Sequence, residues 1–102
     1  MNSINQTQVF TDWLAGLRDP IAKKRVVARI RLAENGSFGT HRFAGDGVWE
    51  MKIDYGPGYR LYYAQEGSTI YLLLVGGDKR TQDRDIEKAK ILWNAAKKGE
   101  EK

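Results

Sequence analysis

The sequence contains no cysteine and only one histidine, His41, among its 102 residues. Without thiols it can form neither a disulfide bond nor a thiolate metal site, and such a composition fits a reducing compartment. One imidazole and scattered carboxylates do not make a recognisable ligand set, so we expect no metal and no cofactor. A phosphate-cradling glycine motif is also missing, because Gly76-Gly77 lacks the required spacing.

Long hydrophobic runs are missing as well. The longest strongly apolar segment, residues 72–75, is far shorter than a membrane span or a signal-peptide core, which predicts a cytoplasmic protein with no membrane partner. The 41% apolar share nevertheless excludes a disordered chain. The length predicts a single domain over residues 1–102, with a flexible tail from about residue 97.

Apolar spacing predicts two N-terminal helices and one C-terminal helix. The first follows a Thr7 cap and ends near residue 18; the second begins after Asp19 and stops at Gly36; the last follows Thr81. Because almost no loop separates the first two helices, we expect them to form an antiparallel hairpin on one face of a sheet. The stripes predicted to be buried are Val9, Phe10, Trp13, Leu14 and Leu17; Val26, Val27, Ile30 and Ala33; and Ile86, Ala89, Trp93 and Ala96.

Alternating apolar residues predict the strands. They are residues 37–43, 48–55, 59–65 and 69–75, with a brief edge strand within residues 1–6. The strand at 69–75 is an unbroken apolar run that Gly76-Gly77 should end, which is typical of a strand buried on both faces. The sequence therefore predicts an α+β fold, with two N-terminal helices packed on an antiparallel, twisted sheet of four to five strands and a C-terminal helix.

The central hairpin, residues 48–65, carries the most informative pattern. If a three-residue loop sets Tyr55 opposite Tyr59, the pairs on one face are Asp54 with Arg60, Lys52 with Tyr62 and Glu50 with Ala64. The other face then builds the core. The solvent-facing side would present Glu50, Lys52, Asp54, Arg60 and Tyr62 together.

A basic loop after the last strand should meet this face. The chain reverses at Gly67, so the loop that carries Asp78, Lys79 and Arg80 returns to the Arg60 end of the neighbouring strand. A concave patch with several cations, one or two carboxylates and a phenol is suited to hold a phosphodiester.

The same patch has the groups needed for RNA cleavage by the 2′-hydroxyl. That reaction requires a base for the hydroxyl, positive charge on the pentacoordinate phosphorus, and an acid for the departing 5′-oxygen. Glu50 or Lys52 would be the base and Arg60 the charge clamp. Lys79 or Arg80 would be the acid or a second clamp.

Further RNA contacts are predicted from Lys23, Lys24, Arg42 and Tyr62. The net charge of +4 suits a polyanionic partner without identifying one. Each of these features also has a purely structural interpretation. The basic residues of the second helix would form a solvated face, Asp54 and Arg60 a cross-strand ion pair, and His41 would be structural.

Three segments resemble the addiction-module killer proteins of the RelE/HigB toxin superfamily: residues 13–19 (WLAGLRD), 53–63 (IDYGPGYRLYY) and 74–82 (LVGGDKRTQ). The likeness extends from about Phe10 to Trp93. It implies a RelE-like fold and a toxin of a type II toxin-antitoxin pair, typically a ribosome-dependent endoribonuclease, or mRNA interferase, that cuts mRNA and inhibits translation. The implied partners are mRNA, the ribosome and a cognate antitoxin, which is usually a small helix-turn-helix DNA-binding protein. The toxin would contact DNA only indirectly, through this antitoxin.

By position in this resemblance, Arg60 matches the family's phosphate-binding arginine and Lys52 a basic residue of the preceding strand. Lys79 and Arg80 match the basic residues after the last strand, and Glu50 is similar to a strand glutamate that some members use as a base. Several relatives carry a tyrosine or histidine just after the basic loop, where this chain has residues 82–85, QDRD. Either cleavage is then slow, or Lys79, Arg80 or His41 serves as the acid instead. The alternative function is a non-catalytic RNA- or ribosome-binding module that blocks translation.

Overall fold

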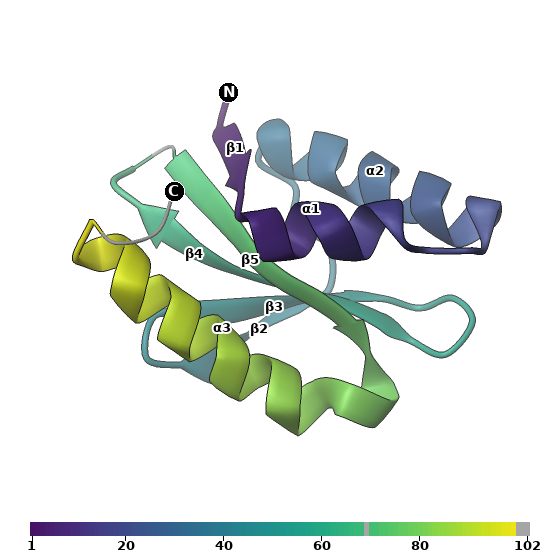
Figure 1. Ribbon diagram of the computed structural model, residues 1–102. Coiled ribbons are helices and arrows are strands. Elements are labelled where there is room, and N and C mark those ends of the chain that lie inside the picture. Colours follow the sequence, from purple (N-terminus) through teal and green to yellow (C-terminus); the bar gives the residue numbers. More distant parts are fainter. Residues whose placement is uncertain (69, 100–102) are drawn as a thin grey trace.

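A computed structural model describes residues 1–68 and 70–99, and within these residues the chain forms one five-stranded sheet and three α-helices (Figure 1). The elements are β1 (Ser3–Gln6), α1 (Gln8–Ala15), α2 (Pro20–Glu34), β2 (His41–Gly45), β3 (Val48–Ile53), β4 (Tyr59–Glu66), β5 (Ile70–Asp78), a 3-10 turn η1 (Lys79–Thr81) and α3 (Gln82–Lys97).

The strand order across the sheet is β1-β5-β4-β3-β2. Strands β2 to β5 pair antiparallel with their sequence neighbours, as predicted, whereas β1 pairs parallel with β5. The sheet is therefore mixed, because β1 joins it from far away in the sequence and no hairpin sets its direction. Helices α1 and α2 cover one face and α3 covers the other, which confirms the α+β prediction (Figure 1).

Two hydrophobic cores lie on opposite faces of this sheet. The core under α1 and α2 includes Phe10, Val26 and Ile30, and the core under α3 includes Ala89 and Trp93. Strand β5 contributes to both, since Leu73 packs in the first core while Leu74 and Val75 pack in the second. Burial of both faces explains why this strand lacks polar alternation.

The helix boundaries follow from capping side chains. The Thr7 hydroxyl accepts a hydrogen bond of 3.0 Å from the backbone N–H of Phe10, and the Asp19 carboxylate accepts one of 2.9 Å from Ile21. Both caps were predicted. Helix α1 ends at Ala15 rather than near residue 18: after the Gly16 N–H bonds the Asp12 carbonyl at 3.0 Å, the Leu17 N–H bonds the Leu14 carbonyl at 3.3 Å, a tighter i to i−3 contact.

The end of β5 corrects a sequence prediction. The strand continues through Gly76 and Gly77 to Asp78 instead of stopping before them. A Cβ on Gly76 would collide with the Trp13 indole on one face, and a Cβ on Gly77 would collide with the Asp85 carboxylate on the other. The two glycines therefore let helices approach the sheet from both sides and do not mark a turn.

The register of the central hairpin is two residues away from the prediction. Ile53 lies opposite Tyr59 and Lys52 opposite Arg60, so the Asp54–Arg60 pairing is wrong. The chain leaves the ladder before Asp54, since the Tyr55 hydroxyl donates a 2.9 Å hydrogen bond to the Asp19 carboxylate at the start of α2. A shift by two preserves which residues share a face.

The predicted solvent-facing side of the hairpin is also corrected. Tyr62 is fully buried, and Glu50 and Arg60 are only 3% and 7% exposed. The C-terminal helix packs over this face, and its stripe of Ala89 and Trp93 forms a core there. The alternation of the sequence predicted a solvent-exposed polar face. In the structure this face is a largely buried polar cluster at the margin of the second core.

Smaller differences concern element ends. Strand β2 begins at His41 rather than at residue 37, and the Phe38 ring instead stacks on Tyr63 with centroids 5.3 Å apart. Thr81 makes no capping hydrogen bond at α3. Of the predicted tail, Lys97 is the last residue of α3, and residues 100–102 lie outside the described residues.

Candidate functional site

Three strands, β2, β3 and β4, bring polar side chains together on the α3 face of the sheet. Because Arg42 lies opposite Glu50, Glu50 opposite Tyr62, and Lys52 opposite Arg60, these residues share one face. The structure thus gathers all three residues predicted from the central hairpin to be catalytic, Glu50, Lys52 and Arg60. It adds the two predicted RNA contacts Arg42 and Tyr62 to the same cluster.

Glu50 is the centre of this cluster. Its Oε1 accepts a 2.8 Å hydrogen bond from Arg42 Nε, and its Oε2 accepts one of 2.8 Å from Gln82 Nε2. Arg60 Nε lies 3.5 Å from the same Oε2. With both oxygens engaged, the carboxylate orients two guanidinium groups and the start of α3 rather than standing free to accept a substrate proton.

Arg60 is held from two sides. Its Nη1 donates a 2.9 Å hydrogen bond to the Gly58 carbonyl, and its Nε, which is buried, has no hydrogen-bond partner in the described part of the chain. Because the buried Nε faces the Glu50 carboxylate, only the terminal guanidinium nitrogens are left to bind an anion that reaches Arg60.

Lys52 lies directly across from Arg60 and is exposed. Its backbone is fixed by α2, because Arg29 Nη1 donates a 2.7 Å hydrogen bond to the Lys52 carbonyl. Arg29 Nη2 donates another, also 2.7 Å, to the Phe38 carbonyl. Desolvation lowers the pKa of the Arg29 guanidinium, which nevertheless stays charged because its ordinary pKa is so high. Arg29 therefore fixes the backbone of the strand that carries Lys52.

A cleft of about 190 Å³ opens at this cluster. It is lined by Thr40, His41, Arg42, Glu50, Lys52, Arg60 and Gln82. A second depression of about 350 Å³ continues from Gln82 along Lys79–Thr81 to the first turn of α3. Three cations therefore border the cleft, and two more border the neighbouring depression before α3 begins.

The basic loop reaches the Arg60 end of the cleft as predicted. A Cβ placed on Gly58 would lie 3.3 Å from Arg60 Nη1 and 3.8 Å from Lys79 Cβ, so both side chains flank Gly58. Arg80 is turned toward Asp78, with Nη2 donating to Oδ2 at 2.9 Å. This hydrogen bond lowers the pKa of Asp78 and raises that of Arg80. Lys79 is therefore the less restrained cation of the loop.

Two residues of the cluster were missed by sequence reasoning. Asp85 is 6% exposed, lies over Gly77 and accepts a 2.5 Å hydrogen bond from the Thr81 hydroxyl. Gln82 bonds Glu50 as described. The Thr81 and Asp85 spacing of four residues was a usable signal, but an acid in the first helical turn is explained equally well by the helix dipole.

Neither Tyr62 nor His41 presents a free phenol or imidazole in the cleft. The Tyr62 hydroxyl is buried without a hydrogen-bond partner among the described residues, and burial together with the nearby Glu50 charge raises its pKa. His41 contributes to the lining of the cleft, but its ring lies beside Phe38 and Trp49 on the other face, with centroids 6.1 Å and 5.8 Å away. The cleft thus presents cations as its proton donors.

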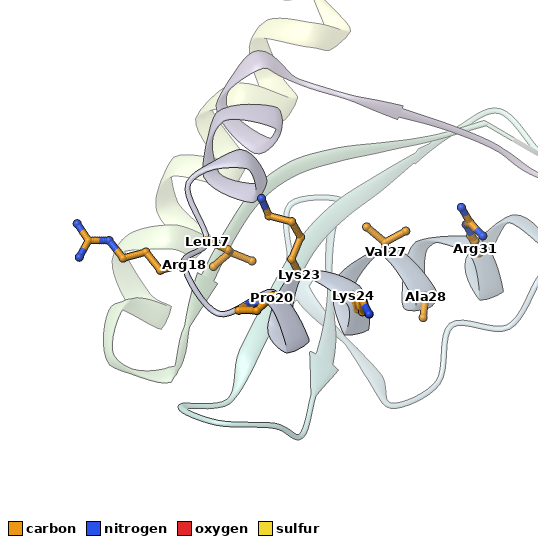
Figure 2. A pocket seen from close by; sticks show the side chains of 8 residues that line it. All are labelled: Leu17, Arg18, Pro20, Lys23, Lys24, Val27, Ala28 and Arg31. Carbon is orange, nitrogen blue, oxygen red and sulfur yellow. The ribbon is translucent and has the colours of Figure 1, made fainter.

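Lys23 and Lys24 lie elsewhere. They belong to α2, which covers the opposite face of the sheet from the cleft, and they border a separate groove (Figures 1 and 2). Their predicted contact with RNA stays a prediction, and the structure does not join them to the cluster around Arg60.

Across residues 1–68 and 70–99, His, Asp and Glu side chains form no group of three that could hold a metal ion. Within the same part of the chain, no helix combines the length and apolar character needed to cross a bilayer.

The fold and cleft define a small α+β protein with a cationic site at the edge of its second core. No family model matches the chain. The chain is 43% identical over 89 residues to an uncharacterized protein of Haemophilus influenzae, a match that covers 87% of this chain and 90% of that protein. The chain therefore belongs to the same family as this Haemophilus protein.

Proposed function

We propose that this chain is the toxin of a type II toxin-antitoxin pair, an mRNA interferase that cleaves message on the ribosome and so inhibits translation. The observation that supports the proposal is that Lys52 and Arg60 line one cleft, while Lys79 lies beside Arg60 across Gly58 and lines the neighbouring depression. These are three of the basic positions at which the sequence resembles RelE/HigB toxins. The Haemophilus relative is uncharacterized, so it bears neither on the resemblance to toxins nor on the activity.

In this proposal Arg60 binds the scissile phosphate. Its guanidinium, preorganised by Gly58 and Glu50, would neutralise the charge that builds on the phosphoryl oxygens as the 2′-oxygen bonds to phosphorus. The bond from phosphorus to the 5′-oxygen breaks, leaving a 2′,3′-cyclic phosphate and a 5′-hydroxyl. No metal is required by this sequence of steps.

Lys52 is the better candidate for the base. Glu50, the other candidate, already accepts hydrogen bonds at both oxygens, whereas Lys52 is exposed beside Arg60. In its neutral form Lys52 would take the proton of the 2′-hydroxyl, and Lys79 would give a proton to the departing 5′-oxygen. Arg42 and Arg80 would bind flanking phosphates.

The test uses purified protein and ribosomes programmed with a defined mRNA. We expect discrete cuts whose ends are a cyclic phosphate and a 5′-hydroxyl. Lys52→Ala should slow cleavage by about 10²-fold, the usual worth of a general base. Arg60→Lys should slow it by about 10²-fold or more, because an ammonium cannot reproduce the guanidinium fork.

Lys88→Ala is the matched control, because Lys88 is an exposed lysine of α3 outside the cleft. It should leave cleavage unchanged. Cutting that persists at full rate in Lys52→Ala and Arg60→Lys would contradict the proposed site. Melting temperatures of all variants separate a chemical effect from unfolding.

One observation favours the second candidate, a non-catalytic module that binds RNA or the ribosome. The cleft offers neither a free imidazole nor a free phenol as the acid, since Tyr62 is buried and the His41 ring lies on the other face. A ribosome that stalls on intact message would support this module over the nuclease. Growth arrest alone does not separate them, because both predict it.

The partners follow from the proposal. A toxin requires a cognate antitoxin, and the resemblance implies a small helix-turn-helix protein that would carry any DNA contact. A gene for such a protein beside this one would support the assignment, and harmless overexpression would count against it.

A further inference from the structure

A groove of about 640 Å³ lies where the connection between α1 and α2 meets the outer surface of α2 (Figure 2). It is lined by Leu17, Arg18, Pro20, Lys23, Lys24, Val27, Ala28 and Arg31. The groove belongs to the layer of α1 and α2, whereas the cleft around Arg60 belongs to the opposite face of the sheet (Figure 1). The proposed function makes no use of it.

The floor of the groove is aliphatic. Leu17, Pro20, Val27 and Ala28 provide it. The apolar surface does not stop there, because Ile21 and Leu32 on the adjoining stripe of α2 are 53% and 48% exposed. Apolar side chains clustered in this way on the outside of a helix are typical of an interaction surface.

The rim of the groove is basic. Arg18 and Arg31 lie at its two ends and Lys24 between them (Figure 2). In the part of the chain that the structure describes, none of these three forms an ion pair with a carboxylate. The only acid within α2 is Glu34, at its last position. The rim thus carries uncompensated positive charge around an apolar floor.

We propose that this groove binds an acidic, amphipathic helical segment of a protein partner. Aliphatic side chains on one stripe of the segment would fill the floor, and carboxylates beside that stripe would meet Arg18, Lys24 and Arg31. The row from Pro20 to Arg31 is about 17 Å long, which matches about three helical turns of the partner. RNA is the poorer fit, since the floor has no aromatic ring on which a base could stack.

The position of the groove has a consequence for the cleft. A segment bound on α2 lies on the other layer from Lys52 and Arg60, so it would tether the partner and leave the cleft open. The proposal goes beyond the proposed function and does not depend on RNA chemistry.

The probe for the test is a synthetic helical peptide of about twelve residues, with leucines at alternating spacings of three and four and glutamates at most other positions. Binding to the full chain is followed by fluorescence anisotropy of a labelled peptide. The same leucines with lysines in place of the glutamates make the control peptide. We expect the acidic peptide to bind and the basic one to bind at least tenfold more weakly.

Two variants locate the binding. Ala28→Glu puts a carboxylate in the middle of the floor, and Arg31→Glu reverses one rim charge; both should weaken the acidic peptide about tenfold or more. Both sites are exposed on a helix, where glutamate is well tolerated. Lys88→Glu on α3 changes net charge as much as Arg31→Glu does and should leave binding unchanged.

The proposal is overturned if the acidic peptide does not bind, if the basic peptide binds equally well, or if Lys88→Glu weakens binding as much as Arg31→Glu. It is also overturned if a single-stranded RNA displaces the peptide and loses affinity in Arg31→Glu, because the groove would then be an RNA surface. The cleavage assay on the same variants reports on the proposed function separately. Peptide binding without mRNA cleavage would support the groove proposal and contradict the nuclease proposal. Cleavage without peptide binding would support the nuclease proposal and contradict the groove proposal.

Discussion

The Asp85 carboxylate lies directly over the backbone of Gly77, in the space that a side chain at position 77 would fill. Gly77 itself pairs with Arg60 across β4 and β5, so this contact places the first turn of α3 beside the cluster. Gly77→Ala should lower the free energy of unfolding by about 2 kcal/mol, because the added methyl group must displace the carboxylate. Denaturant unfolding measures the change.

A double-mutant cycle tests that cause. Asp85→Ala removes the obstructing carboxylate. The loss of unfolding free energy caused by Gly77→Ala should therefore be about 1 kcal/mol smaller in the Asp85→Ala background than in the parent protein. Equal costs in both backgrounds would show that the glycine is needed for another reason.

Glu50→Gln should be strongly destabilising. The side chain of Glu50 is 4% exposed and that of Arg60 8% exposed, so the variant leaves a buried guanidinium without its counter-charge. Removing one partner of a buried pair costs about 3 kcal/mol or more. Glu87→Gln, which breaks an exposed pair with Lys90, should cost less than about 1 kcal/mol. Similar losses in the two variants would argue against Glu50 as the centre of the cluster.

Alkaline pH should destabilise the protein through Tyr62. Because burial raises the pKa of Tyr62 in the folded state, the unfolded chain releases this proton first, near the ordinary pKa of about 10. The stabilisation is therefore complete below about pH 10 and falls as pH rises above it. Denaturant unfolding at a series of pH values should show this fall, and it should be shallower in Tyr62→Phe.

At neutral pH the same variant should be nearly neutral or slightly stabilising. The Tyr62 hydroxyl has no hydrogen-bond partner in the described part of the chain, so its removal deletes an unsatisfied buried group. A large loss of stability in Tyr62→Phe at pH 7 would show that the hydroxyl is bonded after all.

Binding of single-stranded RNA should depend on salt through Lys52. If Lys52 neutralises one phosphate, Lys52→Ala should reduce the slope of log affinity against log salt by about 0.7. Lys88→Ala, outside the cleft, should leave the slope unchanged. A slope that is the same in both variants would place Lys52 away from the RNA backbone.

Much of this fold was predictable because its signals are local. The caps at Thr7 and Asp19 and the apolar stripe of α3 involve residues a few positions apart. The shared face of Glu50, Lys52 and Arg60 was predictable too, since a shift of register by two leaves strand faces unchanged.

The rest depends on contacts between residues far apart in the sequence. Burial of the polar face could not be predicted, because alternation does not say whether a helix will later cover the polar side. The sequence predicts that Gly76 and Gly77 end the strand, because the helices that pack against them leave no local signal at those positions. The predicted residue pairing of the hairpin was wrong for a similar reason, because it depends on the hydrogen bond between Tyr55 and Asp19, which are far apart in the sequence.

The place of β5 between β1 and β4 has a consequence for how the chain matures during synthesis. Everything that emerges before Ile70 lacks the strand that supports both helix layers, and β1 and β4 each expose an unpaired edge. The cleft of a nascent chain therefore lacks its supporting strand until β5 has left the translation machinery.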